Sequence, residues 1–144
     1  MKINKNLRNI LIGIVVVGLI GGIYAYTEYN RKPADLSTAK ADISISATQL
    51  LAEYSQDEKA ANAKYLNKVT SVQGVLKSID KDHTGSISLS LDAGDPLSAV
   101  SCELDPRHLA DADQVHNGDS VIVTGLCTGM LTDVVLVRCS ARKK

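Results

Sequence analysis

The chain has 144 residues, 16 basic and 16 acidic side chains, and five aromatic residues that are all tyrosine. Its zero net charge hides an asymmetry, because residues 1–41 carry six basic and two acidic side chains whereas residues 42–144 carry ten and fourteen. A part with surplus acidic groups is repelled by phosphate backbones and anionic lipid, so the composition argues against nonspecific nucleic-acid binding.

An uncharged apolar stretch, residues 10–26, follows a basic tail at residues 1–9. A helix of this length reaches about 25 Å, close to the roughly 30 Å hydrocarbon core of a bilayer, so the stretch is predicted to be a transmembrane anchor. A cleaved signal peptide is the alternative, but it needs small residues at its cleavage site and Ala25-Tyr26-Thr27 fits poorly. No cysteine precedes Cys102, which argues against lipid attachment beside the anchor.

Charges on the two sides of this stretch predict its orientation only weakly. Three basic residues precede it and three follow it: Lys2, Lys5 and Arg8, then Arg31, Lys32 and Lys40. The compact basic tail is typical of a signal anchor, which predicts a cytoplasmic amino end and an exported domain. Gly18 and Gly22 form a GxxxG pair that would suit a helix homodimer, although glycines tolerated singly in an apolar span are the favoured interpretation.

Beyond the anchor, residues 27–41 are polar and contain Pro33, which predicts a tether. Residues 42–144 suffice for one hydrophobic core and not for two, so one domain is expected. Ser46 and Ser55 each begin a capping-box pattern, with Gln49 and Glu58 three residues later. Two short helices are therefore predicted, at about 47–54 and 56–66.

From Val69 onward the pattern changes to that of strands. Val72 lies on an even position but Val75 and Ile79 lie on odd ones, so the buried face switches near Gly74 and predicts a structural β-bulge there. Alternating apolar residues predict further strands, and a short helix is compatible with one connection: strands at 87–91, 100–104, 120–127 and 133–140, and the helix within 107–115.

This order of elements, with three strands, a short helical connection and two more strands, is the topology of an OB-fold. A bent first strand fits, because in such a barrel that strand pairs on both sides. The predicted fold is therefore mainly β with short helices, a five-stranded Greek-key barrel preceded by a short helix pair and an N-terminal transmembrane helix.

Several segments together resemble the tRNA_anti-like family, bacterial OB-fold proteins that are often anchored in the cell envelope. The segments are the run from Asp57 to Tyr65, Val72-Gln73-Gly74-Val75, Val100-Ser101-Cys102, Gly125-Leu126-Cys127-Thr128-Gly129 and Asp133-Val134-Val135-Leu136. The resemblance covers about residues 45–141. It implies an OB-fold domain and carries over no catalytic residues. The apolar stretch and its basic tail predict a single-pass location in the bacterial inner membrane with an extracytoplasmic, periplasmic domain.

The three cysteines, Cys102, Cys127 and Cys139, lack the C-x-x-C spacing of zinc or thioredoxin-like sites. The third and fifth strands of an OB barrel are neighbours, which makes a disulfide between Cys102 and Cys139 possible in an oxidising compartment. The equally acceptable interpretation is three small apolar core residues.

No residues indicate a metal or cofactor site. The segment from Asp80 to Gly85 begins like an EF-hand loop, but Leu91 stands where the bidentate Glu is needed, so an ordinary hairpin loop is expected. His83, His108 and His116 are expected at the surface, with spacings that suggest no shared metal.

The sequence therefore predicts a membrane-anchored binding or scaffolding module, not an enzyme, whose partner is an envelope protein or glycan. No cofactor is expected. The alternative is a protein that binds single-stranded nucleic acid, which the fold and the family name suggest. The predicted strands carry no aromatic residue on which bases would stack, so this alternative is less favoured.

Overall fold

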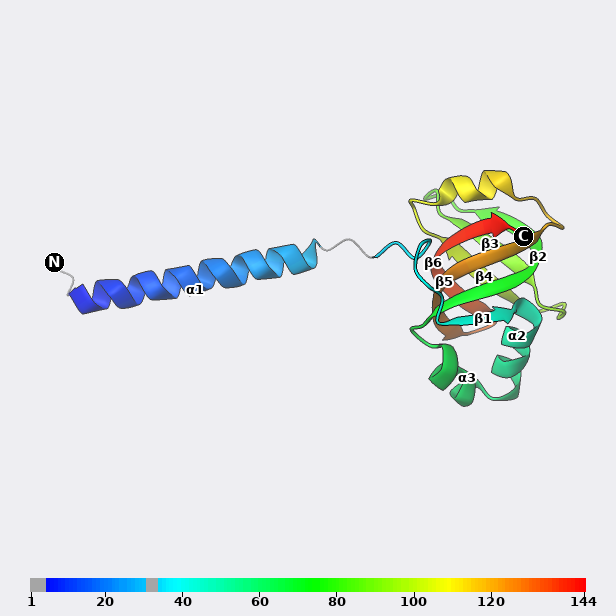
Figure 1. Ribbon diagram of the computed structural model, residues 1–144, viewed down its shortest axis with the longest axis horizontal. Coiled ribbons are helices and arrows are strands. Elements are labelled where there is room, and N and C mark those ends of the chain that lie inside the picture. Colours follow the sequence, from blue (N-terminus) through cyan, green and yellow to red (C-terminus); the bar gives the residue numbers. More distant parts are fainter. Residues whose placement is uncertain (1–4, 31–33) are drawn as a thin grey trace. The chain divides into compact units, whose positions relative to one another are not determined.

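The computed structural model describes residues 5–30 and 34–144. They fall into two compact units, of which the second spans Asp35–Lys144 (Figure 1). Among the residues weighed for the orientation, Lys2, Arg31 and Lys32 lie outside the described part of the chain, as does Pro33 of the predicted tether.

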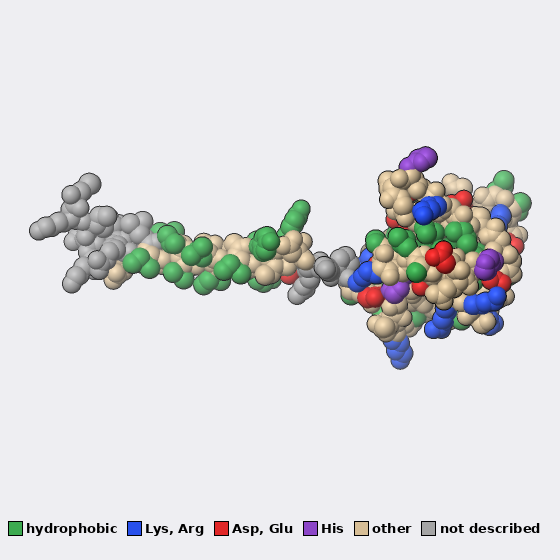
Figure 2. All heavy atoms as spheres, turned by 90° about the horizontal axis from the view of Figure 1, so that it is seen from above, with side chains coloured by type: hydrophobic (Ala, Val, Ile, Leu, Met, Phe, Trp, Pro, Cys, Tyr) green, Lys and Arg blue, Asp and Glu red, His purple; other side chains and the backbone are tan. Residues whose placement is uncertain are grey.

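The described residues of the first unit form one helix, α1 (Lys5–Tyr29), which is longer than the predicted stretch 10–26. Its segment Ile12–Tyr29 has the length and the apolar composition that crossing a membrane requires. Hydrophobic side chains lie exposed along it, as Figure 2 shows. Gly18 and Gly22 have open space around them, and the predicted helix homodimer stays a prediction.

Five strands of the second unit form a closed barrel. They are β2 (Val69–Lys81), β3 (Ile87–Asp92), β4 (Ala99–Leu104), β5 (Ser120–Met130) and β6 (Val134–Lys143). The pairs β2–β3, β3–β4, β5–β6 and β2–β5 are antiparallel, and β4–β6 is parallel, so the ring of pairings closes. This is the predicted strand topology of an OB-fold.

A sixth strand, β1 (Ile43–Ser46), lies outside the ring and was not predicted. It runs parallel to the first half of β2, with Ile43 opposite Thr70 and Ser46 opposite Gln73. Four residues are too few for an alternating pattern to stand out, and Ser46 also reads as a helix cap.

The β-bulge of β2 is real, but its predicted position at Gly74 is wrong. The register between β2 and β5 runs unbroken through Gly74, from Val69 opposite Leu126 to Val75 opposite Ser120. The shift occurs on the β3 side between Leu76 and Ser78, which makes Lys77 the extra residue.

Gly74 instead allows a helix to approach the barrel closely. A Cβ atom at this position would lie 3.1 Å from the Cβ of Ala47 and 3.3 Å from the Cβ of Leu91. Ala47 is the first residue of α2 (Ala47–Gln56). The glycine is therefore explained by packing.

Two short helices follow β1, as predicted. Ser46 caps α2 and accepts a hydrogen bond from the amide of Gln49 at 3.2 Å. The second helix, α3 (Glu58–Tyr65), is capped by Asp57, whose Oδ1 accepts from the amide of Ala60 at 3.0 Å. The cap predicted at Ser55 is wrong because α2 continues to Gln56.

The helices cover the two ends of the barrel (Figure 1). Buried Leu50, Leu51 and Tyr54 of α2, with Tyr65 of α3, enter the apolar core, and the two tyrosine rings have centroids 6.0 Å apart. At the opposite end lies η1 (Leu109–Gln114), a short 3-10 helix within the predicted range 107–115.

The folded unit begins earlier than the predicted boundary at residue 42. Leu36 is only 6% exposed, and Asp35 makes contacts with side chains of the barrel unit. The end of the predicted tether 27–41 is thus part of the folded domain.

Candidate functional site

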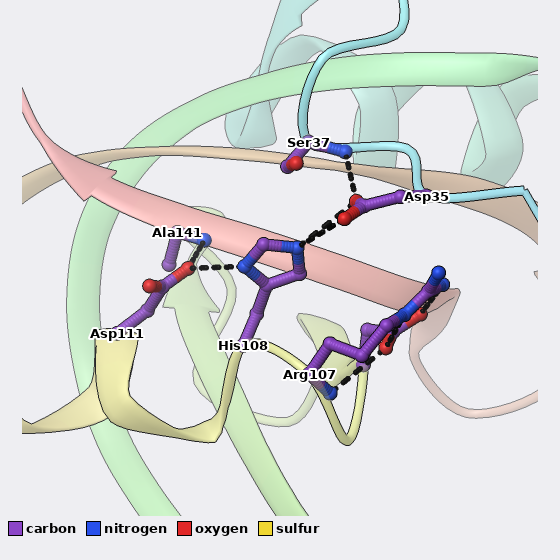
Figure 3. A network of polar contacts seen from close by, with 7 residues as sticks. Asp35, Ser37, Arg107, His108, Asp111 and Ala141 are labelled. Atoms are coloured by element: carbon purple, nitrogen blue, oxygen red, sulfur yellow. Dashed lines mark hydrogen bonds and ion pairs between the residues drawn. The ribbon is translucent and has the colours of Figure 1, made fainter.

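A cluster of polar side chains joins the start of the folded unit to η1 and β6 (Figure 3). It consists of Asp35, Ser37, His108 and Asp111, and is called here the His108 cluster. The Nε2 atom of His108 lies 2.9 Å and 3.1 Å from the two carboxylate oxygens of Asp35. An ionised carboxylate only accepts hydrogen bonds, so Nε2 carries the proton.

The imidazole lies between two carboxylates. Asp111 Oδ2 accepts a hydrogen bond from the amide of Ala141 at 2.9 Å and stands 3.8 Å from Nδ1 of His108. Hydrogen bonds from the amide and the hydroxyl of Ser37, followed by that from His108, lower the pKa of Asp35. The cluster therefore holds an ionised Asp35 against the barrel.

His108 was expected at the surface, but its side chain is part-buried, with 21% of it exposed. The partner that buries it, Asp35, lies 73 residues earlier in a segment that the sequence presents as a tether. No local pattern links the two residues.

The turn that carries His108 is fixed by an ion pair. Asp105 is 4% exposed and accepts hydrogen bonds from Nε and Nη2 of Arg107, at 2.8 Å and 2.6 Å. These bonds lower the pKa of Asp105 to about 2. The carbonyl of Asp105 also accepts from the amide of His108 at 2.7 Å, so the pair positions the imidazole.

A cavity of about 230 Å³ opens beside the His108 cluster. Its walls come from the start of the folded unit, η1, β5 and β6, and they are mostly polar. The lining residues are Ser37, His108, Asp111, Ile122, Thr124, Ser140, Ala141 and Arg142. The cavity thus offers hydroxyls, a carboxylate, an imidazole and a guanidinium to a ligand.

A line of hydroxyl side chains runs from this cavity across the outside of the sheet. Ser44 of β1 is opposite Ser71 of β2, Ser71 is opposite Thr124 of β5, and Thr124 is opposite Ser140 of β6. These four residues are called here the outer hydroxyl row. All four are at least partly exposed, and Thr124 donates a hydrogen bond to Ser71 at 3.5 Å.

The wall formed by β2, β3 and β4 is also polar. Ser78, Ser90 and Ser101 stand opposite one another on the three strands, with Ser88 and the acidic Glu103 in the next row. This is the wall on which OB-folds commonly bind oligonucleotides. None of the described strands contains an aromatic residue.

The three cysteines are buried free thiols. Cys102 and Cys139 lie on the adjacent strands β4 and β6, as predicted, and a hydrogen bond with Cys102, together with burial, raises the pKa of the Cys139 thiol. Cys127 contacts the hydroxyl of Tyr54 at 3.4 Å. A disulfide between Cys102 and Cys139 stays a prediction.

The segment that resembles the start of an EF-hand forms a hairpin turn. Asp82 Oδ1 accepts hydrogen bonds from Thr84 Oγ1 at 2.7 Å, and from the amides of Thr84 and Ser86 at 2.8 Å and 2.9 Å. These bonds lower the pKa of Asp82. His83 in this turn and His116 are exposed, and within residues 5–30 and 34–144 no three His, Cys, Asp or Glu side chains are arranged to hold a metal ion.

Comparison with protein families and solved structures relates the chain to one family and to several known structures. The tRNA_anti-like family model matches residues 1–141. A crystal structure of a candidate nucleic acid-binding lipoprotein from Klebsiella pneumoniae subsp. pneumoniae aligns with a TM-score of 0.59 and 21% identity, over 78% of this chain and all of that one. The Stn1–Ten1 complex of S. pombe aligns with a TM-score of 0.44 and 19% identity, over 53% of this chain and 57% of that one. No curated protein matches the chain.

Proposed function

Since the chain belongs to the tRNA_anti-like family, we propose that it is a membrane-tethered OB-fold binding module that holds an envelope protein or glycan without catalysing a reaction. The observation that carries this proposal is the outer surface of the barrel. It presents aligned hydroxyl side chains beside a polar cavity and lacks stacking residues on its strands.

The environment of His108 favours binding over catalysis. A general base that activates a nucleophile needs a hydroxyl or thiol within hydrogen-bond reach. The ring nitrogens of His108 face Asp35 and Asp111 instead, and within the described residues no hydroxyl or thiol hydrogen bonds to this ring. The cluster therefore acts as a structural clamp that shapes the cavity.

The proposed location is the bacterial inner membrane, with the amino end in the cytoplasm and the barrel outside. The apolar segment Ile12–Tyr29 and the basic residues before it support this arrangement. Fusion of alkaline phosphatase or of green fluorescent protein after Lys144 tests it. We expect an active phosphatase and a dark fluorescent protein, and the reverse pattern would contradict the orientation.

Photo-crosslinking in cells tests the binding role. A photoreactive amino acid replaces Arg142 at the rim of the cavity in the full-length chain, and Asp113, an exposed residue of η1, is the matched control position. We expect an adduct with an envelope protein or glycan from position 142 and a weaker one from position 113. Equal labelling at both positions, or none at either, would count against a binding module.

Binding of single-stranded nucleic acid is the second candidate, and the description of the Klebsiella lipoprotein favours it. The chemistry of the barrel opposes it. Stacking on aromatic side chains is worth about 1–3 kcal/mol per base, and the strands carry no such side chain. Acidic and basic side chains are mixed on the face that Figure 2 shows, so no continuous cationic track lies there.

Fluorescence anisotropy with labelled single-stranded DNA and RNA distinguishes the two candidates. We expect no appreciable binding at about 150 mM salt, because residues 42–144 hold more acidic than basic groups. A dissociation constant in the micromolar range or below that persists at this salt would contradict the proposed envelope ligand. It would support binding of single-stranded nucleic acid instead.

A further inference from the structure

We propose that the outer hydroxyl row and the adjoining cavity bind an uncharged polysaccharide chain, with one sugar unit seated in the cavity. This inference rests on the proposed binding role and names the class of its ligand. It concerns the β5–β6 wall of the barrel, which adjoins the β3–β4 wall along the β4–β6 pair but is not the wall that OB-folds commonly use.

The geometry provides a repeating track across the strands. Ser44, Ser71, Thr124 and Ser140 share one register line across β1, β2, β5 and β6, and neighbouring strands are about 4.8 Å apart. Thr124 and Ser140 belong both to this row and to the lining of the cavity. A chain of hydroxyl-bearing units lying across the strands would meet a hydroxyl on each strand in turn.

The chemistry of the cavity matches a sugar. Sugar hydroxyls donate and accept hydrogen bonds, and Ser37, Thr124 and Ser140 do both. Asp111 binds the amide of Ala141 through Oδ2, and within the described residues Oδ1 has no hydrogen-bond partner, as Figure 3 illustrates. Arg142 supplies a guanidinium donor at the rim.

Size and charge select a small neutral unit. At about 230 Å³ the cavity is smaller than the roughly 300–1,000 Å³ of pockets that enclose drug-sized ligands. Its guanidinium, from Arg142, is balanced by the carboxylate of Asp111, and Asp35 adds a further negative charge nearby. An anionic ligand such as a phosphate therefore gains no net attraction.

A peptide is less suitable on this wall. Extended peptides commonly bind by adding a strand to a free sheet edge. Here β5 is paired with both β2 and β6, and β6 is paired with both β4 and β5, so the two strands that line the cavity offer no free edge. The free edge belongs to β1, at the far end of the row. A peptide at the cavity would have to be recognised through its side chains alone, whereas a sugar chain needs only the hydroxyls that this wall presents.

Titration of the full-length chain in phospholipid nanodiscs, free of sugar-based detergent, tests the proposal by amide NMR. The probes are maltohexaose and chitohexaose. We expect at least one of them to shift the amides of Thr124, Ser140 and Ala141, with a dissociation constant on the order of 1 mM because no aromatic ring stacks on the sugar.

Three variants locate the site. Thr124→Val and Ser140→Ala each remove one hydroxyl and should weaken binding about three- to ten-fold. Ser90→Ala, a matched serine of the β3–β4 wall, should leave the affinity unchanged. An unchanged amide spectrum away from the substitution verifies that each variant is folded.

Three results would overturn the proposal. The first is the absence of shifts with both oligosaccharides at about 10 mM. The second is a set of shifts that centres on Ser90 and Ser101, and the third is an equally strong response to a neutral Gly-Ser hexapeptide. If photo-crosslinking from position 142 captures an envelope protein while the oligosaccharides cause no shifts, the binding module stands and its polysaccharide ligand is refuted.

Discussion

Gly125 of β5 is a position where the barrel leaves no room for a side chain. A Cβ atom here would overlap the Sγ atom of Cys139 and lie 3.0 Å from the carbonyl oxygen of Val137. The register between β5 and β6 shifts at this point, and Arg138 adopts a positive φ of 53° to accommodate the extra residue. The bulge of β6 thus places the Sγ atom of Cys139 where a side chain at position 125 would lie.

Substitution Gly125→Ala should lower the free energy of unfolding by about 1–3 kcal/mol, because it overpacks this contact. Urea unfolding of the Asp35–Lys144 unit measures it. The same substitution in a Cys139→Ala background should cost less, because the Sγ atom that it meets is gone. Equal costs in the two backgrounds would show that the contact with Cys139 is unimportant.

Asp105 should make the stability of the domain depend on acid. Its folded-state pKa of about 2 lies below its ordinary value of 3.8, so its contribution is present above that ordinary value and is lost as the pH falls towards 2. Asp105→Asn should lower the free energy of unfolding by about 1–3 kcal/mol at neutral pH. It should also flatten the loss of stability between about pH 5 and pH 2.

Chemical unfolding at several pH values checks this expectation. Asp113→Asn, which changes an exposed carboxylate of η1, is the control and should keep the wild-type pH profile. If the free energy of unfolding of Asp105→Asn changed with pH in parallel with that of the wild type, the expectation would be contradicted. The ion pair with Arg107 would then not favour the ionised carboxylate in the folded state.

At the level of the elements, α3 begins at a cap that a single substitution can remove. Asp57→Ala should destabilise the domain by about 1 kcal/mol, because the amide of Ala60 loses its acceptor. Ser55→Ala, at the cap that the sequence suggested, should change stability by less than about 0.5 kcal/mol, because Ser55 is an exposed residue within α2. Thermal unfolding measures the stability of both variants. A larger loss of stability in Ser55→Ala than in Asp57→Ala would indicate that Ser55 is the cap.

The strands of the barrel were predictable because burial on one face leaves an alternating pattern. Leu89 and Leu91, and then Val100, Cys102 and Leu104, alternate with polar residues and are buried as this pattern requires. The order of these strands around the single helical connection was enough to predict the OB-fold, which the barrel and the family match confirm.

Features that depend on partners distant in the sequence were missed. The β-bulge lies at Lys77 because of the pairing with β3, while Gly74 is small because α2 packs on it. His108 is part-buried because Asp35 returns to it from 73 residues away. No local pattern places the bulge at Lys77 or links His108 to Asp35, so the candidate site became visible only in the folded structure.

At the level of the whole molecule, we expect the mature protein to keep its anchor. The apolar stretch ends in Tyr24-Ala25-Tyr26, where a signal peptidase needs small residues. Intact-mass measurement of protein extracted from membranes should therefore give a chain that starts at Met1 or Lys2. An amino terminus between Ala25 and Ala41 would show that the helix is a cleaved signal.

The pairing of distant strands determines when the domain can fold. Val69 pairs with Leu126, and β4 gains its second neighbour only from β6. Contacts so far apart in sequence make folding slow compared with that of helical domains. During synthesis, β2, β3, β4 and β5 are complete before β6, and until β6 arrives the edges of β4 and β5 are unpaired and able to join other chains. The ten residues Val134–Lys143 therefore convert an aggregation-prone open sheet into a closed barrel, and a chaperone that protects this domain would act before they emerge.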